Sequence, residues 1–136
     1  MGKILMFKDA DFSEVAVDVV PTGVIELTPT ILNGLAIDLD GTITSNSSFA
    51  IYYVPMIAGR TYQLKILWSG VHLMRVGKSS NVPVLDSTLT LLVNQEPGHG
   101  TTSLDYAYIA ESNGYLAWQM HIADTIKCLI KEWQYE

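Results

Sequence analysis

Charged side chains are scarce in this sequence. They make up 16% of the 136 residues, whereas roughly 25% is usual for a soluble domain. Eight are basic and fourteen are acidic, for a net charge of −6. The basic residues are scattered, so we expect no positive face for nucleic acid or an anionic membrane. A surface this poor in charge, with 49% hydrophobic residues, is either rich in Ser, Thr, Asn and Gly or buried against another chain. We therefore expect a homo-oligomer or a stable complex with other structural proteins.

Cysteine and long apolar runs are also lacking. Cys128 is the single cysteine, which excludes an internal disulfide and a CxxC metal site. Its apolar neighbours predict a buried, inert thiol. No apolar run approaches the roughly 20 residues that span a bilayer, so membrane insertion is not expected. The N-terminal apolar stretch is only Ile4–Phe7, too short for a signal peptide. If Met1 is the native start, the protein is not exported by the general route.

Short alternating or apolar runs, separated by Gly, Pro, Asn and Asp, are typical of an all-β domain. Asp40-Gly41 and Asn113-Gly114 each predict a tight hairpin, because these dipeptides supply the positive φ angles of such turns. Ala58-Gly59 predicts another turn. In the clearest strand Tyr62, Leu64, Ile66 and Trp68 point one way and Gln63 and Lys65 the other. The predicted strands are Val15–Val20, Val24–Leu27, Leu35–Leu39, Thr42–Ser45, Phe49–Val54, Thr61–Trp68, His72–Val76, Thr88–Val93, Leu104–Ile109 and Tyr115–Ile122.

The two ends of the chain are less regular. Near the C-terminus, Thr125–Trp133 fits a strand by the alternation of Ile126, Cys128 and Ile130, and it also fits one face of a helix. The β-branched residues favour the strand. Residues 1–14 are expected to form an arm or a short helical turn. The whole chain, 1–136, is predicted to be one antiparallel two-sheet sandwich.

One motif suggests catalysis. Asp38, Asp40, Gly41 and Thr42 match the DxDGT pattern of haloacid-dehalogenase-type phosphatases, in which a carboxylate attacks a phosphoryl group beside Mg²⁺. That fold alternates strands with crossover helices, and this sequence has no such rhythm. We interpret Asp40-Gly41 as a hairpin turn. We expect no enzyme activity, no catalytic residue and no cofactor.

Metal ligands are not grouped in the sequence. His72, His99 and His121 stand apart, without an HxH or HExxH pattern, so no metal site is expected. His99 lies in the glycine-rich segment 97–102, which makes it a candidate for ligand contact.

Aromatic residues are the better candidates for binding. Tyr52 and Tyr53 are adjacent, so on a strand they face opposite sides. Sugar-binding modules stack such rings on a pyranose and surround it with a few polar groups. The candidate ligand-binding residues are Tyr52, Arg60, Arg75, His99 and Trp118, with Asn81 and Asn113 as further loop contacts; the alternative is that most aromatics fill the core.

Five segments carry a resemblance to a known family: Asn33–Ile43, Ser47–Pro55, Ala58–Tyr62, Tyr106–Ile109 and Asn113–Leu116. Their order resembles the galactose-binding-like jelly-roll sandwiches of carbohydrate-binding modules and bacteriophage structural proteins. The resemblance implies a jelly-roll fold and a binding or structural role. It carries over no metal, because the loop that binds structural Ca²⁺ in many members has no counterpart here.

Two functions follow as hypotheses. The first is a non-enzymatic structural or adhesion domain of a larger assembly, such as a phage capsid decoration, head-fibre or tail protein on a virion surface. The alternative is a carbohydrate-binding module that recognises a neutral glycan through loop aromatics.

Overall fold

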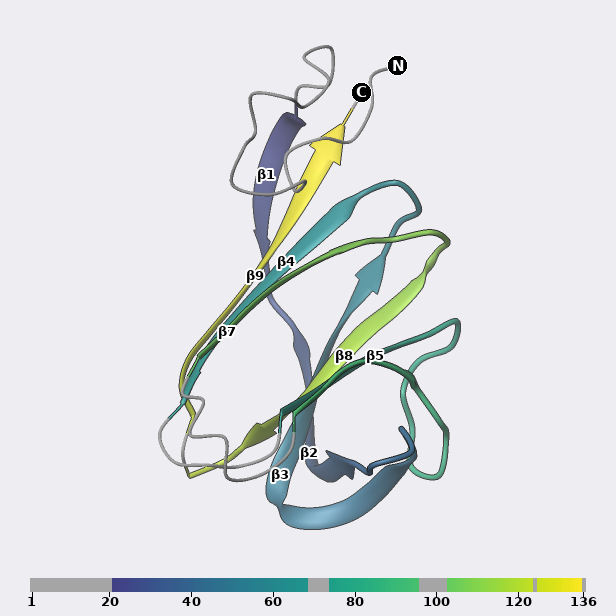
Figure 1. Ribbon diagram of the computed structural model, residues 1–136, viewed down its shortest axis with the longest axis vertical. Coiled ribbons are helices and arrows are strands. Elements are labelled where there is room, and N and C mark those ends of the chain that lie inside the picture. The colour runs from purple at the N-terminus through teal and green to yellow at the C-terminus, as the bar shows by residue number, and fades with distance from the viewer. Residues whose placement is uncertain (1–20, 69–73, 96–102, 124, 136) are drawn as a thin grey trace.

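The computed structural model describes residues 21–68, 74–95, 103–123 and 125–135. The predicted N-terminal arm, the predicted strand Val15–Val20, His72 and His99 lie outside these ranges. Within them the chain forms β-strands and no helix (Figure 1). The strands are β1 (Pro21–Leu27), β2 (Thr30–Ile37), β3 (Ile43–Met56), β4 (Thr61–Trp68), β5 (Met74–Ser79), β6 (Thr90–Gln95), β7 (Ser103–Ile109), β8 (Gly114–His121) and β9 (Thr125–Tyr135). The described residues contain no helix that is long and apolar enough to cross a membrane.

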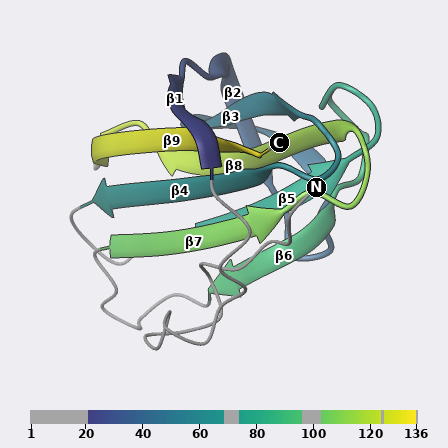
Figure 2. The same cartoon turned by 90° about the horizontal axis from the view of Figure 1, so that it is seen from above.

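Two antiparallel sheets form the predicted sandwich. Sheet A has the order β1-β9-β4-β7 and sheet B the order β2-β3-β8-β5-β6. Figure 2 shows β9, β4 and β7 side by side in one layer. The pairs β1 with β9, β3 with β8, β4 with β7 and β5 with β6 nest inside one another along the chain. A long ribbon folded back on itself and rolled into two sheets has this pairing, so the fold is a jelly roll.

The main core lies between the two sheets. The predicted alternation of β4 is confirmed: Tyr62, Leu64, Ile66 and Trp68 are buried, whereas Lys65 is exposed. Across the core, sheet B contributes alternate side chains from the second half of β3 and from β8. The C-terminal element is a strand, as its β-branched residues favoured over the helix, and its inward-facing Ile130 is buried.

A second, smaller core lies on the outer face of sheet B. Strand β3 is fourteen residues long, and its first part, paired with the end of β2, curls back over the sheet (Figure 1). Ile37 and Ile43 of this hairpin pack with Ile51, Leu89 and Ala117. The sequence predicted two separate strands, Thr42–Ser45 and Phe49–Val54, where the chain forms one continuous strand.

Two of the predicted turns are confirmed and one is wrong. Asp40-Gly41 joins β2 to β3, with φ +91° at Gly41, and Ala58-Gly59 turns the chain with φ +87° at Gly59. Asn113-Gly114 does not close a hairpin, because β7 pairs with β4 in sheet A and β8 pairs with β3 and β5 in sheet B. A glycine is needed at position 114 for another reason: a Cβ there would lie 2.6 Å from the Ser79 carbonyl oxygen.

Candidate functional site

The predicted ligand-binding residues do not converge on one site. Tyr52 and Trp118 are neighbours on β3 and β8, Arg75 is hydrogen-bonded to Ile37 beside the second core, and Arg60 lies in a polar network with Glu132. His99 is outside the described residues. Asn81 is exposed, and Asn113 is a structural residue, because its Oδ1 accepts a hydrogen bond from the Ala58 N–H at 2.9 Å.

Trp118 cannot be a stacking platform. It is 0% exposed, since Leu116, Trp118 and Met120 alternate toward the main core. Its ring packs against Tyr52, with centroids 6.2 Å apart at an interplanar angle of 42°. The prediction of a ligand contact at Trp118 is therefore wrong, and the alternation of β8 was the sequence signal that it belongs to the core.

Arg75 is also structural. It is 6% exposed, and its Nη1 donates to the Ile37 carbonyl oxygen at 2.6 Å while its Nε donates to Asn94 Oδ1 at 2.8 Å. The backbone N–H of Ile37 donates in turn to Gln119 Oε1 at 2.8 Å. Two side chains from the outer face of sheet B thus satisfy both backbone groups of Ile37. This holds the hairpin on the sheet and corrects the prediction that Arg75 contacts a ligand.

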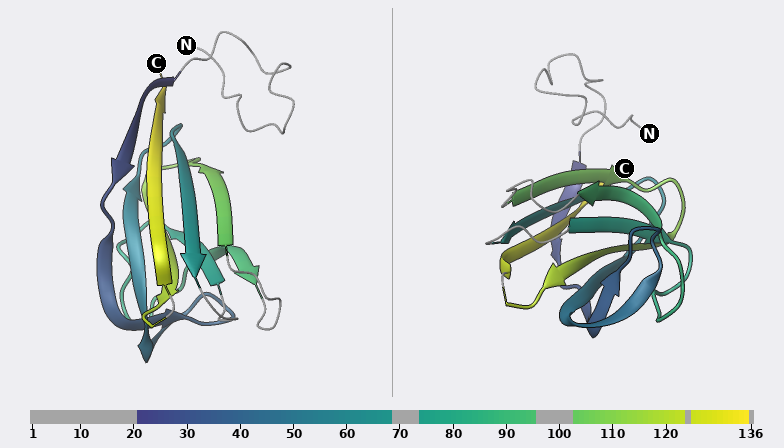
Figure 3. Two further views of the ribbon diagram at one scale, coloured as in Figure 1. Left: turned by 90° about the vertical axis from the view of Figure 1, so that its left-hand side faces the viewer. Right: turned by 60° about the horizontal axis from the view of Figure 1, so that its bottom comes forward.

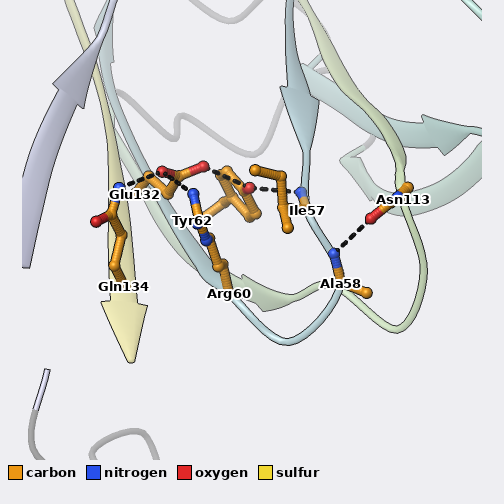
Figure 4. Close-up of polar contacts among 7 residues, drawn as sticks. All are labelled: Ile57, Ala58, Arg60, Tyr62, Asn113, Glu132 and Gln134. Atoms are coloured by element: carbon orange, nitrogen blue, oxygen red, sulfur yellow. Dashed lines mark hydrogen bonds and ion pairs between the residues drawn. The ribbon is translucent and has the colours of Figure 1, made fainter. Parts of the chain in front are cut away.

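Arg60 takes part in a hydrogen-bond network centred on Glu132 (Figure 4). Arg60 Nη1 donates to Glu132 Oε1 at 3.0 Å, and the Tyr62 hydroxyl donates to Glu132 Oε2 at 2.6 Å. Gln134 donates to the same carboxylate, and the Ile57 N–H donates to the Tyr62 oxygen at 2.7 Å. Burial alone would raise the pKa of Glu132, but the donors and the Arg60 charge together lower it. Burial also raises the pKa of Tyr62. A carboxylate with this many donors is kept ionised, and the network links β9 to β4 and to the turn before β4.

Tyr52 lines a hollow in the described structure. We call this hollow the Tyr52 pocket; its volume is about 220 Å³, and it is lined by Ile31, Asn33, Ala50, Tyr52, Met120 and Ile122. Ile31 and Ile122 are 47% and 55% exposed, so its rim is aliphatic. Pockets for small molecules usually hold roughly 300–1,000 Å³. The Tyr52 pocket therefore suits a single ring or the side chain of another protein.

The remaining chemical candidates are Asp38, Asp40 and His121. Asp38 and Asp40 are exposed in the β2–β3 turn, where the Thr42 N–H donates to Asp40 Oδ1 at 2.9 Å. Hydrogen bonds from Thr42 lower the pKa of Asp40. His121 lies against the Phe49 ring, with centroids 5.1 Å apart. In the part of the chain that the structure describes, no three His, Cys, Asp or Glu residues are grouped to hold a metal ion.

Cys128 is half-buried against the main core rather than fully buried. Burial raises the pKa of its thiol to about 11.

Comparison with known proteins identifies no relative. No family model matches the chain, and neither a curated protein nor a solved structure is significantly similar to it. Arguments about function therefore depend on the surface that the structure describes.

Proposed function

We propose that this chain is a non-enzymatic structural and adhesion domain of a larger assembly, of the kind carried on virion capsids, head fibres or tails. The observation that carries this proposal is the side of the sandwich formed by β1 and β2. These strands are separated by only Thr28 and Pro29, and each lies at the end of its sheet among the described strands. Figure 3 shows them following one another along that side.

The exposed side chains of these two strands are unusual for a sheet edge. Val24, Ile25 and Ile31 are each more than 40% exposed, and Glu26 is the one charged residue in either strand. Proteins that remain monomeric usually protect such edges with charges, because an unpaired edge is a template for another chain. The Tyr52 pocket adjoins this side and offers a recess for an apolar side chain. These features support association with a neighbouring subunit.

The test is the solution mass, measured by light scattering after size exclusion. We expect the parent protein to be oligomeric and Ile31→Lys to lower the mass, because it places a charge on the apolar edge. Ile57→Lys is the matched control: Ile57 is 45% exposed but lies at the turn before β4, so the mass should not change. A parent protein that is monomeric up to about 1 mM, where binding would contribute only about 4 kcal/mol, would overturn the proposal.

A carbohydrate-binding module is the second candidate. The observation that favours it is that the Tyr52 ring and the Asn33 amide line the same pocket, because an aromatic ring beside a polar group suits a sugar. On a glycan array we expect binding that Asn33→Ala weakens at least tenfold, with Gln63→Ala on the outer face of sheet A as the control. An array on which the parent protein binds no glycan would remove this candidate.

A further inference from the structure

The outer face of sheet A carries an excess of lysine. Lys65 on β4 and Lys127 and Lys131 on β9 face the same way, since β4 and β9 pair Gln63 with Lys131 and Leu67 with Lys127. Between β4, β7 and β9 lies a hollow of about 480 Å³, lined in part by Lys65, Leu67, Asp105, Lys127 and Leu129. We call this surface the lysine face. It combines a cationic rim with the exposed side chain of Leu67 and the half-buried side chain of Leu129.

The lysines of this face have few partners within the described residues. Lys65 lies 3.7 Å from Asp105, with both side chains more than half exposed, so this ion pair is weak. Lys131 is paired in register with Glu26 on β1. Three lysines thus face two carboxylates, in a chain whose net charge is −6. Elsewhere in the described structure Arg60 is paired with Glu132 and Lys78 with Glu111, and Arg75 is buried.

The opposite face of the molecule has the complementary composition. At the tip of the β2–β3 hairpin, Leu39 is 56% exposed between Asp38 and Asp40. The adjoining segment, Val84–Asp86, exposes two more aliphatic side chains and a third carboxylate. Backbone bonds hold the two segments together: the Asp86 N–H donates to the Ile43 oxygen at 2.9 Å, and the Leu89 N–H donates to the Gly41 oxygen at 2.8 Å. We call this surface the acidic tip.

We propose that the lysine face binds the acidic tip of a second copy of this chain. The acidic tip covers the outer side of sheet B and the lysine face is the outer side of sheet A. One copy therefore cannot bring its own acidic tip into contact with its own lysine face. Attraction between opposite charges would orient the two copies, and Leu39 would enter the hollow beside Leu67 and Leu129. Two different surfaces in contact make a head-to-tail interface, which builds rings or filaments. This inference rests on the proposed assembly function and adds an interface distinct from the β1–β2 edge.

Charge reversal on either surface tests the inference. The first variant is Lys65→Glu with Lys127→Glu, and the second is Asp38→Lys with Asp40→Asn, where asparagine preserves the acceptor for the Thr42 N–H. We expect each variant to lose at least tenfold in self-association through this interface, measured by sedimentation velocity. Mixing the two should restore at least a one-to-one pair, because the intact tip of the first variant fits the intact lysine face of the second. Glu111→Lys is the control, since its side chain is 81% exposed and lies outside both surfaces.

The outcomes separate this inference from the proposed function. If both double variants keep the mass of the parent protein and Ile31→Lys lowers it, the head-to-tail interface is wrong and the assembly function stands. Loss of association without recovery on mixing would also overturn the head-to-tail arrangement. A parent protein that is monomeric throughout would overturn both proposals.

Discussion

Gly41 offers the sharpest test of how the hairpin is held on sheet B. Gly41 and Gly59 have nearly the same backbone conformation, with φ +91° and +87°. A Cβ added at Gly59 would have no atom within 4 Å, whereas at Gly41 it would lie 2.2 Å from the Leu89 carbonyl oxygen. Alanine at either position destabilises the folded state, because a positive φ angle costs a residue with a Cβ about 1–2 kcal/mol. Only Gly41→Ala also forces two backbones apart.

The additional loss at Gly41 can be worked out from its contacts. Overpacking costs about 1–3 kcal/mol, and the hydrogen bond from the Leu89 N–H to the Gly41 oxygen contributes about 0.5–1.5 kcal/mol. We therefore expect Gly41→Ala to lower the free energy of unfolding by about 2.5–6.5 kcal/mol and Gly59→Ala by about 1–2 kcal/mol. For a domain of this size each kcal/mol lowers the melting temperature by roughly 3–5 °C. Calorimetry on both variants checks this, and equal losses at the two positions would refute the close approach at Gly41.

Three further predictions concern the buried polar groups and the thiol. The lowered pKa of Glu132 stabilises the fold above the unfolded pKa of about 4.3, and this contribution is lost as pH falls through the folded pKa. The urea midpoint of Tyr62→Phe should therefore depend less on pH between 6 and about 3 than the urea midpoint of the parent protein. An unchanged pH dependence would contradict the network. Cys128, with a pKa of about 11, should react with a thiol reagent at about pH 8 much more slowly in the native than in the unfolded protein. Equal labelling rates in the two states would contradict its contact with the main core. Gln119→Leu should cost about 1–3 kcal/mol, because it leaves the Ile37 N–H unsatisfied; a loss below about 0.5 kcal/mol by urea unfolding would show that water replaces the amide.

The sandwich could be predicted because the alternation of apolar and polar residues that marks a strand lies in neighbouring residues of the sequence. An alternating strand such as Thr61–Trp68 marks its own buried face, and the structure gives that strand the predicted bounds. In the C-terminal element the same period of two also fitted a helix face, and the β-branched residues were what favoured the strand. The strand pairing was not readable: Asn113-Gly114 has the composition of a hairpin turn, yet the chain there crosses from one sheet to the other. A dipeptide specifies a turn and carries no information about which sheet the next strand joins.

The site residues were harder to predict, because their roles depend on partners far away in the sequence. Arg75 and Gln119 meet Ile37 across 38 and 82 residues, and Tyr62 meets Glu132 across 70. The sequence gives no signal for these contacts. Tyr52 and Tyr53 face opposite sides of β3, as adjacent strand residues must, and each packs against one of the two cores. Tyr52 also lines a pocket, and its contact with a ligand stays a prediction.

The nested pairing of the strands has a consequence for how the protein folds. The β5–β6 hairpin can close from neighbouring residues, but each outer pair must wait for a longer loop to close. Sheet A depends most on the strand that pairs last, because β9 lies between β1 and β4 and pairs with both. During synthesis β1 and β4 leave the ribosome long before β9 and have no partner on those edges in the meantime. Deleting β9 would therefore divide sheet A into separate pieces instead of shortening it, and nascent chains that stop before Thr125 should be targets for chaperones and aggregation.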